Sequence, residues 1–324
     1  MDSQTRRDFM RHTALAGGAL ALTGVGCSKG DGEAPAAVSS APEGASVDMS
    51  IARRKGAPLD HSEEVNRLAA KLTNEAIDRL GGMGRFVSRG DVVWIKPNIA
   101  FVQVPEFATN TNPEVVATLV RLCLEAGAKE VKVGDNSSYG ALRAYPTSGI
   151  EPAVLAAGGK MVYMQMDGFK DMKLGGERLD LWPMYPEVIE SDVIINVPIL
   201  KNHGLTLISA CLKNHMGIAG DPRYLWHTDM PRCLVDAAAF VRAHLSVLDA
   251  VRVLTKNGPS GGDLDDVEQM GIVAASADMV ALEAFGAELL RLDPHKGRTM
   301  ANAQERGLGT VDYRSLALSE TEVA

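Results

Sequence analysis

The fold is decided by the stretch DVIINVP at residues 192–198, which continues as ILKNHG at residues 199–204. Its apolar, β-branched residues follow one another with little polar alternation, as in a strand that is buried on both faces. Strands of this kind occur in parallel sheets whose two faces are covered by helices. The stretch therefore predicts an α/β protein built around a parallel sheet.

Helices and further apolar runs alternate on both sides of this stretch. Helical spacing covers residues 63–80, and a second helix is expected from Pro113 to Glu125, because Asn112 is a good N-cap and proline suits the first turn. Short runs typical of strands occupy residues 91–95, 131–134, 161–164, 245–248 and 271–275. The pattern predicts a mostly parallel sheet with helices on both faces, preceded by a disordered signal and linker segment.

Polar residues follow several of the predicted strands. In an open parallel sheet, ligands bind beyond the carboxyl ends of the strands, so residues there are candidates for one shared site. The residues at these positions are Lys96, Asn98, Asp135, Lys201, His203 and Asp249. Taken singly, each is better explained as an ordinary polar loop residue, whereas six at equivalent positions indicate a common pocket.

The tetrapeptide LKNH occurs twice, at residues 200–203 and 212–215, with a helix-like segment between the two copies. We expect Lys201 and Lys213 to hold a small anionic ligand, because lysine carries a compact charge suited to carboxylate or phosphate. Further ligand contacts are expected from Lys96, Asn98, Asp135, Asn214 and Asp249.

Histidines supply the expected proton chemistry. His203 and His227 are the candidate acid and base, with Asp135 or Asp249 orienting one of the rings. The alternative is a metal site that uses the histidines at 203, 215 and 227. Their spacing differs from the i, i+4 pattern of zinc helices, and the neighbouring lysines would repel a cation. We therefore favour an anion site, assign no metal ligand and leave any cofactor unknown.

The composition and net charge limit the classes of function that the protein can have. The 324 residues carry a net charge of -8 and no basic stripe, which argues against nucleic acid as a partner. Two classes remain: an enzyme acting on a small anionic substrate, and a non-catalytic extracytoplasmic binding or accessory protein for a redox or metal-containing complex. A purely structural lipoprotein is disfavoured, because so many polar groups end strands. The sequence names neither the substrate nor a protein partner.

The N-terminus carries an export address. Residues 5–11 read TRRDFMR and match the twin-arginine consensus, and the apolar segment after them is too short for a spanning helix, which predicts a signal peptide over residues 1–27. The sequence LTGVGC at residues 22–27 resembles a lipobox and makes Cys27 a candidate for lipidation. Residues 28–47 have the composition of a flexible linker before a domain at 48–324. The mature protein is then either a lipoprotein, held at the membrane only through Cys27, or a soluble periplasmic protein.

Three further cysteines, Cys123, Cys211 and Cys233, form no C-x-x-C pair, so no zinc ribbon, iron–sulfur or haem attachment motif is present. One disulfide among them is compatible with an oxidising compartment, but buried free thiols are favoured.

Several short motifs together give the chain a family resemblance. They are IKPN at 95–98, TNPE at 111–114, EAGA at 125–128, GD at 134–135, DVIIN at 192–196, KNHG at 201–204, LKN at 212–214, NGP at 257–259 and GLG at 307–309. This set resembles the domain of unknown function 362 family over roughly residues 90–318. The resemblance implies no reaction, because none is established across the family. Some members carry a ferredoxin-type cysteine cluster, which this chain lacks. The order Lys-x-His, Leu-Lys-Asn-x-x-Gly and a downstream His is also loosely similar to nickel-pincer lactate racemases. This likeness suggests only that a small carboxylate and paired histidines could meet here, and it gives no ground for assigning a nickel cofactor.

Overall fold

The structure is a computed structural model that describes residues 46–324. The chain divides into two units, Met1–Ser39 and Ser40–Ala324, and all described residues belong to the second. The predicted twin-arginine signal, Cys27 and all but the last two residues of the predicted linker lie outside the described residues. The fold is therefore that of residues 46–324.

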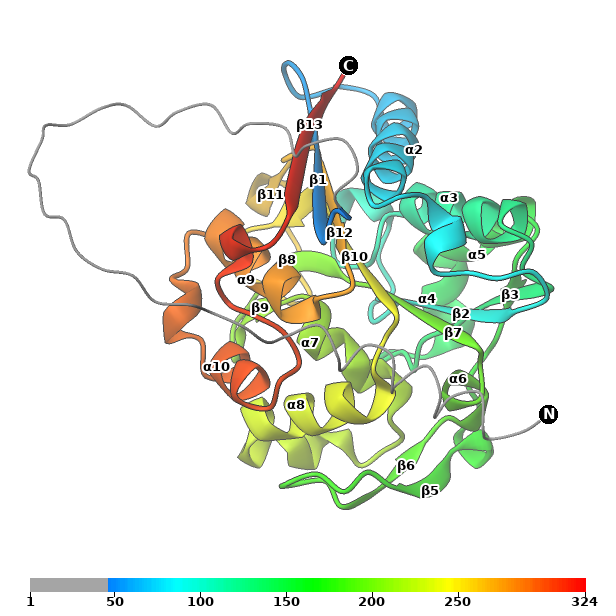
Figure 1. Cartoon of the computed structure of the whole chain (residues 1–324), viewed down its shortest axis with the longest axis vertical. Coiled ribbons are helices and arrows are strands. Elements are labelled where there is room, and N and C mark those ends of the chain that lie inside the picture. Colours follow the sequence, from blue (N-terminus) through cyan, green and yellow to red (C-terminus); the bar gives the residue numbers. More distant parts are fainter. Residues whose placement is uncertain (1–45) are drawn as a thin grey trace, which may run out of the picture. The chain divides into compact units, whose positions relative to one another are not determined.

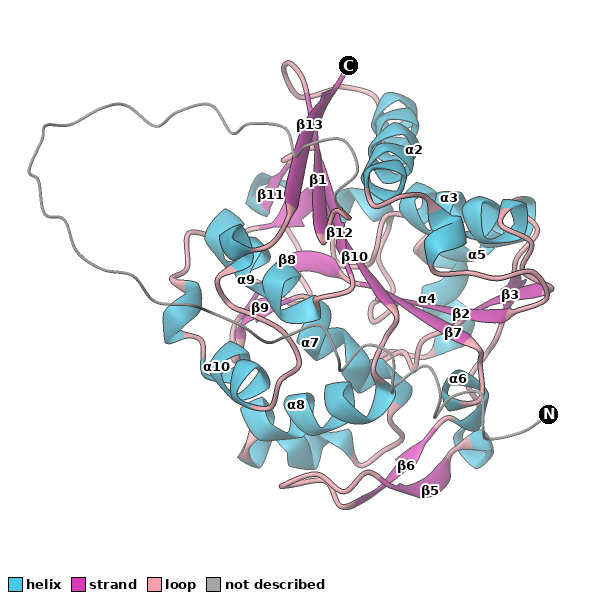
Figure 2. Ribbon diagram, in the orientation of Figure 1, coloured by secondary structure: helices cyan, strands magenta, loops and turns pink. Residues whose placement is uncertain are grey.

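A single large sheet forms the centre of the fold (Figures 1 and 2). Its strands, in spatial order, are β13 (Leu318–Val323), β1 (Met49–Arg54), β12 (Ile272–Ser276), β10 (Leu245–Leu254), β7 (Val193–Val197), β2 (Val92–Pro97), β3 (Glu130–Val133) and β4 (Lys160–Met161). The run from β10 to β4 is parallel throughout, and β12 is antiparallel to both of its neighbours. This confirms the predicted mostly parallel sheet.

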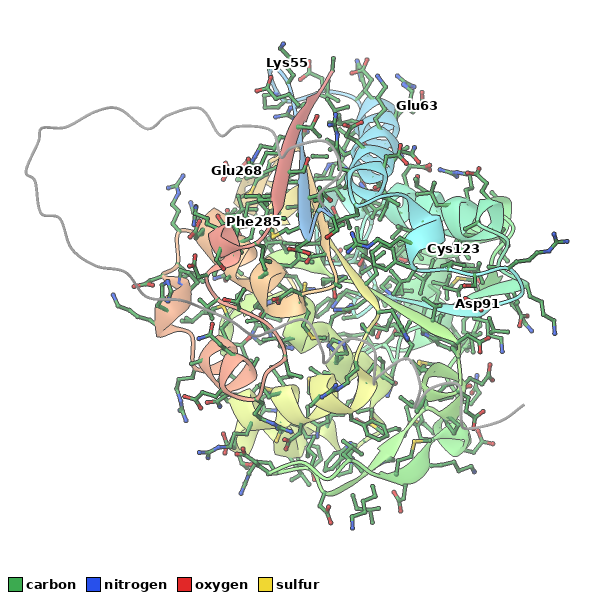
Figure 3. The ribbon with its side chains drawn as sticks, viewed as in Figure 1. Lys55, Glu63, Asp91, Cys123, Glu268 and Phe285 are labelled. Carbon is green, nitrogen blue, oxygen red and sulfur yellow. The ribbon has the colours of Figure 1, made fainter. Side chains whose placement is uncertain are left out.

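Helices cover both faces of the sheet (Figure 2). They are α2 (Ser62–Arg79), α3 (Pro113–Glu125), α4 (Ala141–Thr147), α5 (Ile150–Ala156), α6 (Pro186–Ile189), α7 (Cys211–Asn214), α8 (Met230–Val241), α9 (Met279–Leu289) and α10 (Arg298–Glu305). Successive residues of a strand point to opposite faces, so the core has two sides. Cys123 of α3 and Phe285 of α9, labelled in Figure 3, belong to the apolar clusters on opposite sides.

Two predicted helices begin and end within one residue of the expected positions. The helix α2 begins at Ser62, and its buried face carries the apolar residues that indicated it. At the start of α3, the Asn112 side chain accepts a hydrogen bond from the Glu114 backbone N–H at 2.9 Å, and Pro113 occupies the first turn. Local capping chemistry was therefore a reliable guide here.

The central strand does not end where the sequence indicates. β7 passes through Pro198 directly into β8 (Ile199–His203), and β10 pairs in parallel with both, at Ser246↔Asn196 and Asp249↔Ile199. The segment after β8 was predicted to be helix-like, and this is wrong for its first part. It turns back as β9 (Leu207–Ser209), which forms an antiparallel hairpin with β8 and leaves only a short helix, α7.

The opposite edge of the sheet joins segments from both ends of the described chain. β1 lies between β12 and β13, with Met49 paired to Ser276 on one side and to Leu318 on the other. The remaining strands form two small pairings: β11 (Val267–Glu268) against β10, and the separate hairpin of β5 (Lys170–Lys173) with β6 (Leu181–Met184). No described helix is long and apolar enough to cross a membrane. Cys123, Cys211 and Cys233 are buried and unpaired, as favoured from the sequence.

Candidate functional site

The first contact of the candidate site joins residues at the ends of two neighbouring strands. β2 and β3 run in parallel with Ile95 opposite Val133, so Lys96 and Asp135 emerge side by side. Lys96 Nζ lies 2.8 Å from Asp135 Oδ1, and both side chains are buried. The other carboxylate oxygen of Asp135 accepts the backbone N–H of Ile99 at 2.7 Å, which fixes the loop that follows β2. The predicted convergence of these two strand ends is present in the structure.

Asn214, the last residue of α7, locks Lys96 in place. Its Oδ1 accepts a hydrogen bond from Lys96 Nζ at 2.7 Å, and its Nδ2 donates to the Lys96 carbonyl at 3.0 Å and to Asn196 Oδ1 at 2.8 Å. A buried amide with this many partners is rigid, because each lost bond would leave an unpaired polar group. Gly217 lies against the same pair, and a Cβ there would overlap Asp135 Oδ1 and lie 2.6 Å from Lys96 Nζ.

Lys201 lies behind this pair and is also buried. Its ammonium donates to Asn98 Oδ1 at 3.2 Å and to the Thr109 carbonyl, and it lies 4.8 Å from the centre of the Phe101 ring. Burial lowers the pKa of Lys201 well below its usual value, and the nearby Lys213 charge lowers it further. Lys201 therefore contacts the pocket through Asn98 and does not line it.

An open pocket of about 310 Å³ lies above these contacts. Its walls are formed by Lys96, Asn98, Ala100, Asp135, Asn136, Ser137, Ser138, Ser209, Lys213, Asn214, Met216, Gly217, Asp221, Arg223, Tyr224 and His227. Six of the nine sequence-predicted catalytic and ligand-binding residues are in this set. The three that do not line the pocket are Lys201, His203 and Asp249.

The pocket wall has an excess of positive charge. Lys96 is paired with Asp135, and Arg223 Nε lies 3.1 Å from Asp221 Oδ1. The Lys213 ammonium has only Met216 Sδ beside it, at 4.0 Å, and no carboxylate within ion-pair distance among the described residues. Burial, followed by the charges of Lys96 and Arg223, lowers the pKa of Lys213 to about 8. An anion bound here would supply the missing partner.

The three histidines of the predicted metal alternative have separate surroundings. His203, at the end of β8, accepts the backbone N–H of Leu205 on Nδ1 at 3.1 Å, and burial lowers its pKa to about 3. His215 is fully buried, which lowers its pKa to about 4. His227 is exposed at the pocket, with Nδ1 2.8 Å from the Tyr224 carbonyl oxygen. Within residues 46–324, no group of three or more His, Cys, Asp or Glu side chains is placed to hold a metal ion.

Asp249 occupies the middle of β10 instead of a strand end. Its carboxylate accepts the backbone N–H groups of Asn112 at 2.7 Å and Val251 at 3.0 Å, and burial raises its pKa to about 6. The side chain therefore holds the start of α3 against the sheet. The predicted position failed because β10 continues past Asp249 to pair with β8.

Comparisons with known proteins identify the family to which the chain belongs. A profile described as "Domain of unknown function (DUF362)" matches residues 93–288, which include all nine of the predicted catalytic and ligand-binding residues. The chain belongs to the DUF362 family. A thylakoid-associated protein from Synechocystis sp. is 34% identical over 262 residues, which cover 76% of each chain.

Two solved structures are similar in outline to this DUF362 protein. The lactate racemase apoprotein from Thermoanaerobacterium thermosaccharolyticum has a TM-score of 0.46 at 12% identity, and a protein from Thermotoga maritima has 0.42 at 15%. The matches cover 74% and 73% of this chain, which spans only 56% and 60% of the length of those proteins.

Sequence reasoning missed several residues of the DUF362 pocket. Ser137 and Ser138 follow Asp135 directly, so their place at a strand end was a usable signal. Arg223, Tyr224 and Ser209 had none, because a hairpin and a long loop bring them to the wall. Arg223 Nη1 donates to the Asn136 carbonyl at 2.9 Å, which ties that loop to the end of β3.

Proposed function

We propose that this protein binds a small anionic ligand, a carboxylate or a phosphate, in the pocket at the carboxyl edge of its parallel sheet. The observation that carries the proposal is Lys213, a partly buried ammonium at the pocket that has no carboxylate partner among the described residues. Burying an unpaired charge is unfavourable, and an anionic ligand would remove that penalty. Lys96, Arg223 and the hydroxyl group of Ser138 would complete its coordination, whereas the Ser137 hydroxyl already donates to the Ile99 carbonyl.

Acid–base chemistry at the bound ligand is the catalytic form of this proposal. Lys213, with a pKa of about 8, exchanges its proton near neutral pH, and His227 lines the same pocket. A positioned acid or base of this kind contributes about 10² to 10⁴ in rate. Lys201 would act as a positioning residue through Asn98, and His203 would support the pocket from behind the hairpin without contacting the ligand.

One observation favours the second candidate function, an extracytoplasmic binding or accessory protein without turnover. His203 and His215 are held neutral by burial and do not line the pocket, which leaves His227 as the one histidine on its wall among the described residues. A binding protein needs the lysines and Arg223 but no proton donor. The two functions therefore differ in their dependence on His227.

The test measures binding and turnover separately. Isothermal titration with acetate, pyruvate and inorganic phosphate should detect binding in the wild type that is weakened in Lys213→Met. If His227→Ala still binds the anion but no longer converts it to a product, the catalytic form of the proposal is supported. Unchanged turnover in His227→Ala would exclude His227 as the acid or base. No binding of any of these anions to the wild type would overturn the proposal.

We also infer that the chain is exported by the twin-arginine pathway, with a signal at residues 1–27, a linker at 28–47 and the folded domain at 48–324. The TRRDFMR motif at residues 5–11 supports export. The relative from Synechocystis sp. is named for an association with thylakoids, which supports a location at a membrane. Replacing Arg6 and Arg7 by lysine should retain the precursor in the cytoplasm, and export that continues unchanged would refute the pathway.

Lipidation at Cys27 would decide between an anchored and a soluble periplasmic protein. Radiolabelled fatty acid should be incorporated into the wild type and not into Cys27→Ala. Label that persists in Cys27→Ala would rule out this anchor.

A further inference from the structure

Exposed apolar side chains occur on the same chain segments that supply the wall of the polar pocket. Among the described residues, eleven large hydrophobic side chains are exposed, and seven of them lie within four residues in the sequence of a residue that lines the pocket. Six of the seven, all except Val104, lie on the three segments described next and are called the apolar rim below: Tyr139, Leu142, Leu205, Leu207, Tyr224 and Leu225. Scattered exposed hydrophobics need no explanation, but a group beside one pocket marks an interaction site.

The rim and the polar wall come from the same three segments. The segment after β3 supplies Ser137 and Ser138 to the wall and Tyr139 and Leu142 to the rim. The β8–β9 hairpin supplies Ser209 to the wall and two leucines to the rim. The 3-10 segment at 223–228 supplies wall and rim residues in the same way. Each segment therefore presents a polar group inward beside apolar groups that face solvent.

The segments are held together by contacts that the structure records. Arg223 Nη1 donates to the Asn136 carbonyl at 2.9 Å, which joins the 223–228 segment to the one after β3. The Tyr139 ring lies 5.3 Å from the Phe101 ring, and Phe101 in turn lies over the Lys201 ammonium at 4.8 Å. Through these contacts the apolar rim is connected to the segment after β3 and to the buried Lys201 ammonium.

Leu207 adds an independent observation. It has a φ of 65° in the hairpin and is 61% exposed. A left-handed backbone is unfavourable for a side chain with a Cβ, and glycine or asparagine is the usual choice there. A bulky leucine that is both strained and solvent-exposed is unfavourable for the fold alone, and such outliers are grounds for a functional hypothesis.

From these observations we infer that the ligand is an amphiphile, with an anionic head group in the pocket and a hydrocarbon chain that lies across the apolar rim. The inference rests on the proposed function, since it assigns the head group to the Lys213 pocket. The pocket wall is lined mostly by polar and charged residues, so a hydrocarbon chain would gain little by staying inside and would lie across the rim, where apolar side chains would cover it. A fully polar anion would leave the rim without a partner.

Two series of ligands test the inference by isothermal titration below their micellar concentrations. One runs from inorganic phosphate through butyl to octyl phosphate, and the other from acetate through butanoate to octanoate. We expect affinity in the better series to rise about twofold to fourfold per methylene, as for partial to full burial of each group. Anions that bind with an affinity independent of chain length would overturn the amphiphile and leave the anion pocket intact. An absence of binding throughout, short anions included, would refute both.

Substitutions separate the rim from the pocket. Leu207→Asn should weaken octyl binding severalfold, leave the binding of the short anion unchanged, and keep or raise stability, because asparagine tolerates the left-handed backbone better. Leu155→Asn is the matched control, since Leu155 is 56% exposed on α5, away from the pocket, and should bind as the wild type does. If Leu207→Asn and Leu155→Asn bind the eight-carbon ligand, octyl phosphate or octanoate, with equal affinity, the role of the rim is refuted.

A membrane surface is the alternative partner that could cover the apolar rim in place of a single amphiphile. Vesicles of pure phosphatidylcholine should not sediment with the protein domain, because the inference requires an anionic head group in the pocket. If the wild type and Lys213→Met both sediment with these vesicles, and to the same extent, the rim binds lipid surfaces without the pocket, and the proposal is overturned.

Discussion

Replacing Lys213 by methionine should weaken the binding of an anionic ligand and, at the same time, raise the stability of the unliganded protein. The substitution keeps the apolar stem of the side chain and removes the ammonium that lies beside Met216 in the pocket. A hydrogen bond between charged partners contributes about 1.5–3 kcal/mol, so the affinity for a bound anion should fall by roughly 10- to 150-fold. Titration calorimetry with the tightest-binding anion measures this loss.

The same change should stabilise the unliganded protein. Folding lowers the pKa of Lys213 from 10.5 to about 8, so the folded state disfavours the charged form by about 3 kcal/mol. Below pH 8 both states carry the charge and the full penalty applies. Between pH 8 and 10.5 only the unfolded chain keeps the proton, so the stability of the wild type rises with pH across that window. Lys213→Met should therefore gain up to about 3 kcal/mol at pH 7, a difference that disappears above about pH 10.5.

Urea unfolding of both proteins at pH 7 and at the alkaline end of this window checks the reasoning. Lys129→Met is the control, because Lys129 is exposed and its loss should change stability by no more than about 0.5 kcal/mol. A Lys213→Met variant that is less stable than the wild type at pH 7 would refute the account of an unpaired buried charge. Undiminished anion binding would refute its role in the pocket.

Three further outcomes concern residues at the pocket and one histidine that does not line it. Gly217→Ala should lower the free energy of unfolding by about 1–3 kcal/mol, because its Cβ would force Lys96 and Asp135 apart, whereas Gly84→Ala, with open space around it, should melt as the wild type does. Asn214→Ala should cost about 2–4 kcal/mol in urea unfolding, since its buried partners lose their hydrogen bonds, and a smaller loss would show that water replaces the amide. The His203 ring signals in NMR should not titrate between pH 5 and 8, because burial holds its pKa near 3, and a midpoint near 6.5 would contradict the burial that the structure gives it.

The sequence predicts those features that depend on neighbouring residues. Asn112 and Pro113 locate the start of α3 by capping chemistry alone. Lys96 and Asp135 were correctly expected together, because each ends a short apolar run and parallel strands bring such ends to one edge. Both inferences need only local patterns and one topological rule.

The failures share a different cause, which is pairing between distant segments. Leu207–Ser209 is too short for its periodicity to distinguish strand from helix, and only its partner β8 makes it a strand. Asp249 follows the apolar run 245–248 as a strand end would, yet β10 continues because β8 lies beside it. Lys201 and His203 were expected on the pocket for the same reason and do not line it, because β8 continues β7 past the point where the strand was expected to end.

The arrangement of β1 between β12 and β13 has a consequence for the order of events during synthesis. Within the described part of the chain, the outer edge of β1 is covered by residues 318–323 alone, so these residues must be synthesised before this edge of the sheet can close. Until then the exposed backbone groups of β1 could pair with another chain. Such late closure is compatible with the proposed export of a folded domain, and under that proposal a ligand could be bound in the compartment of synthesis.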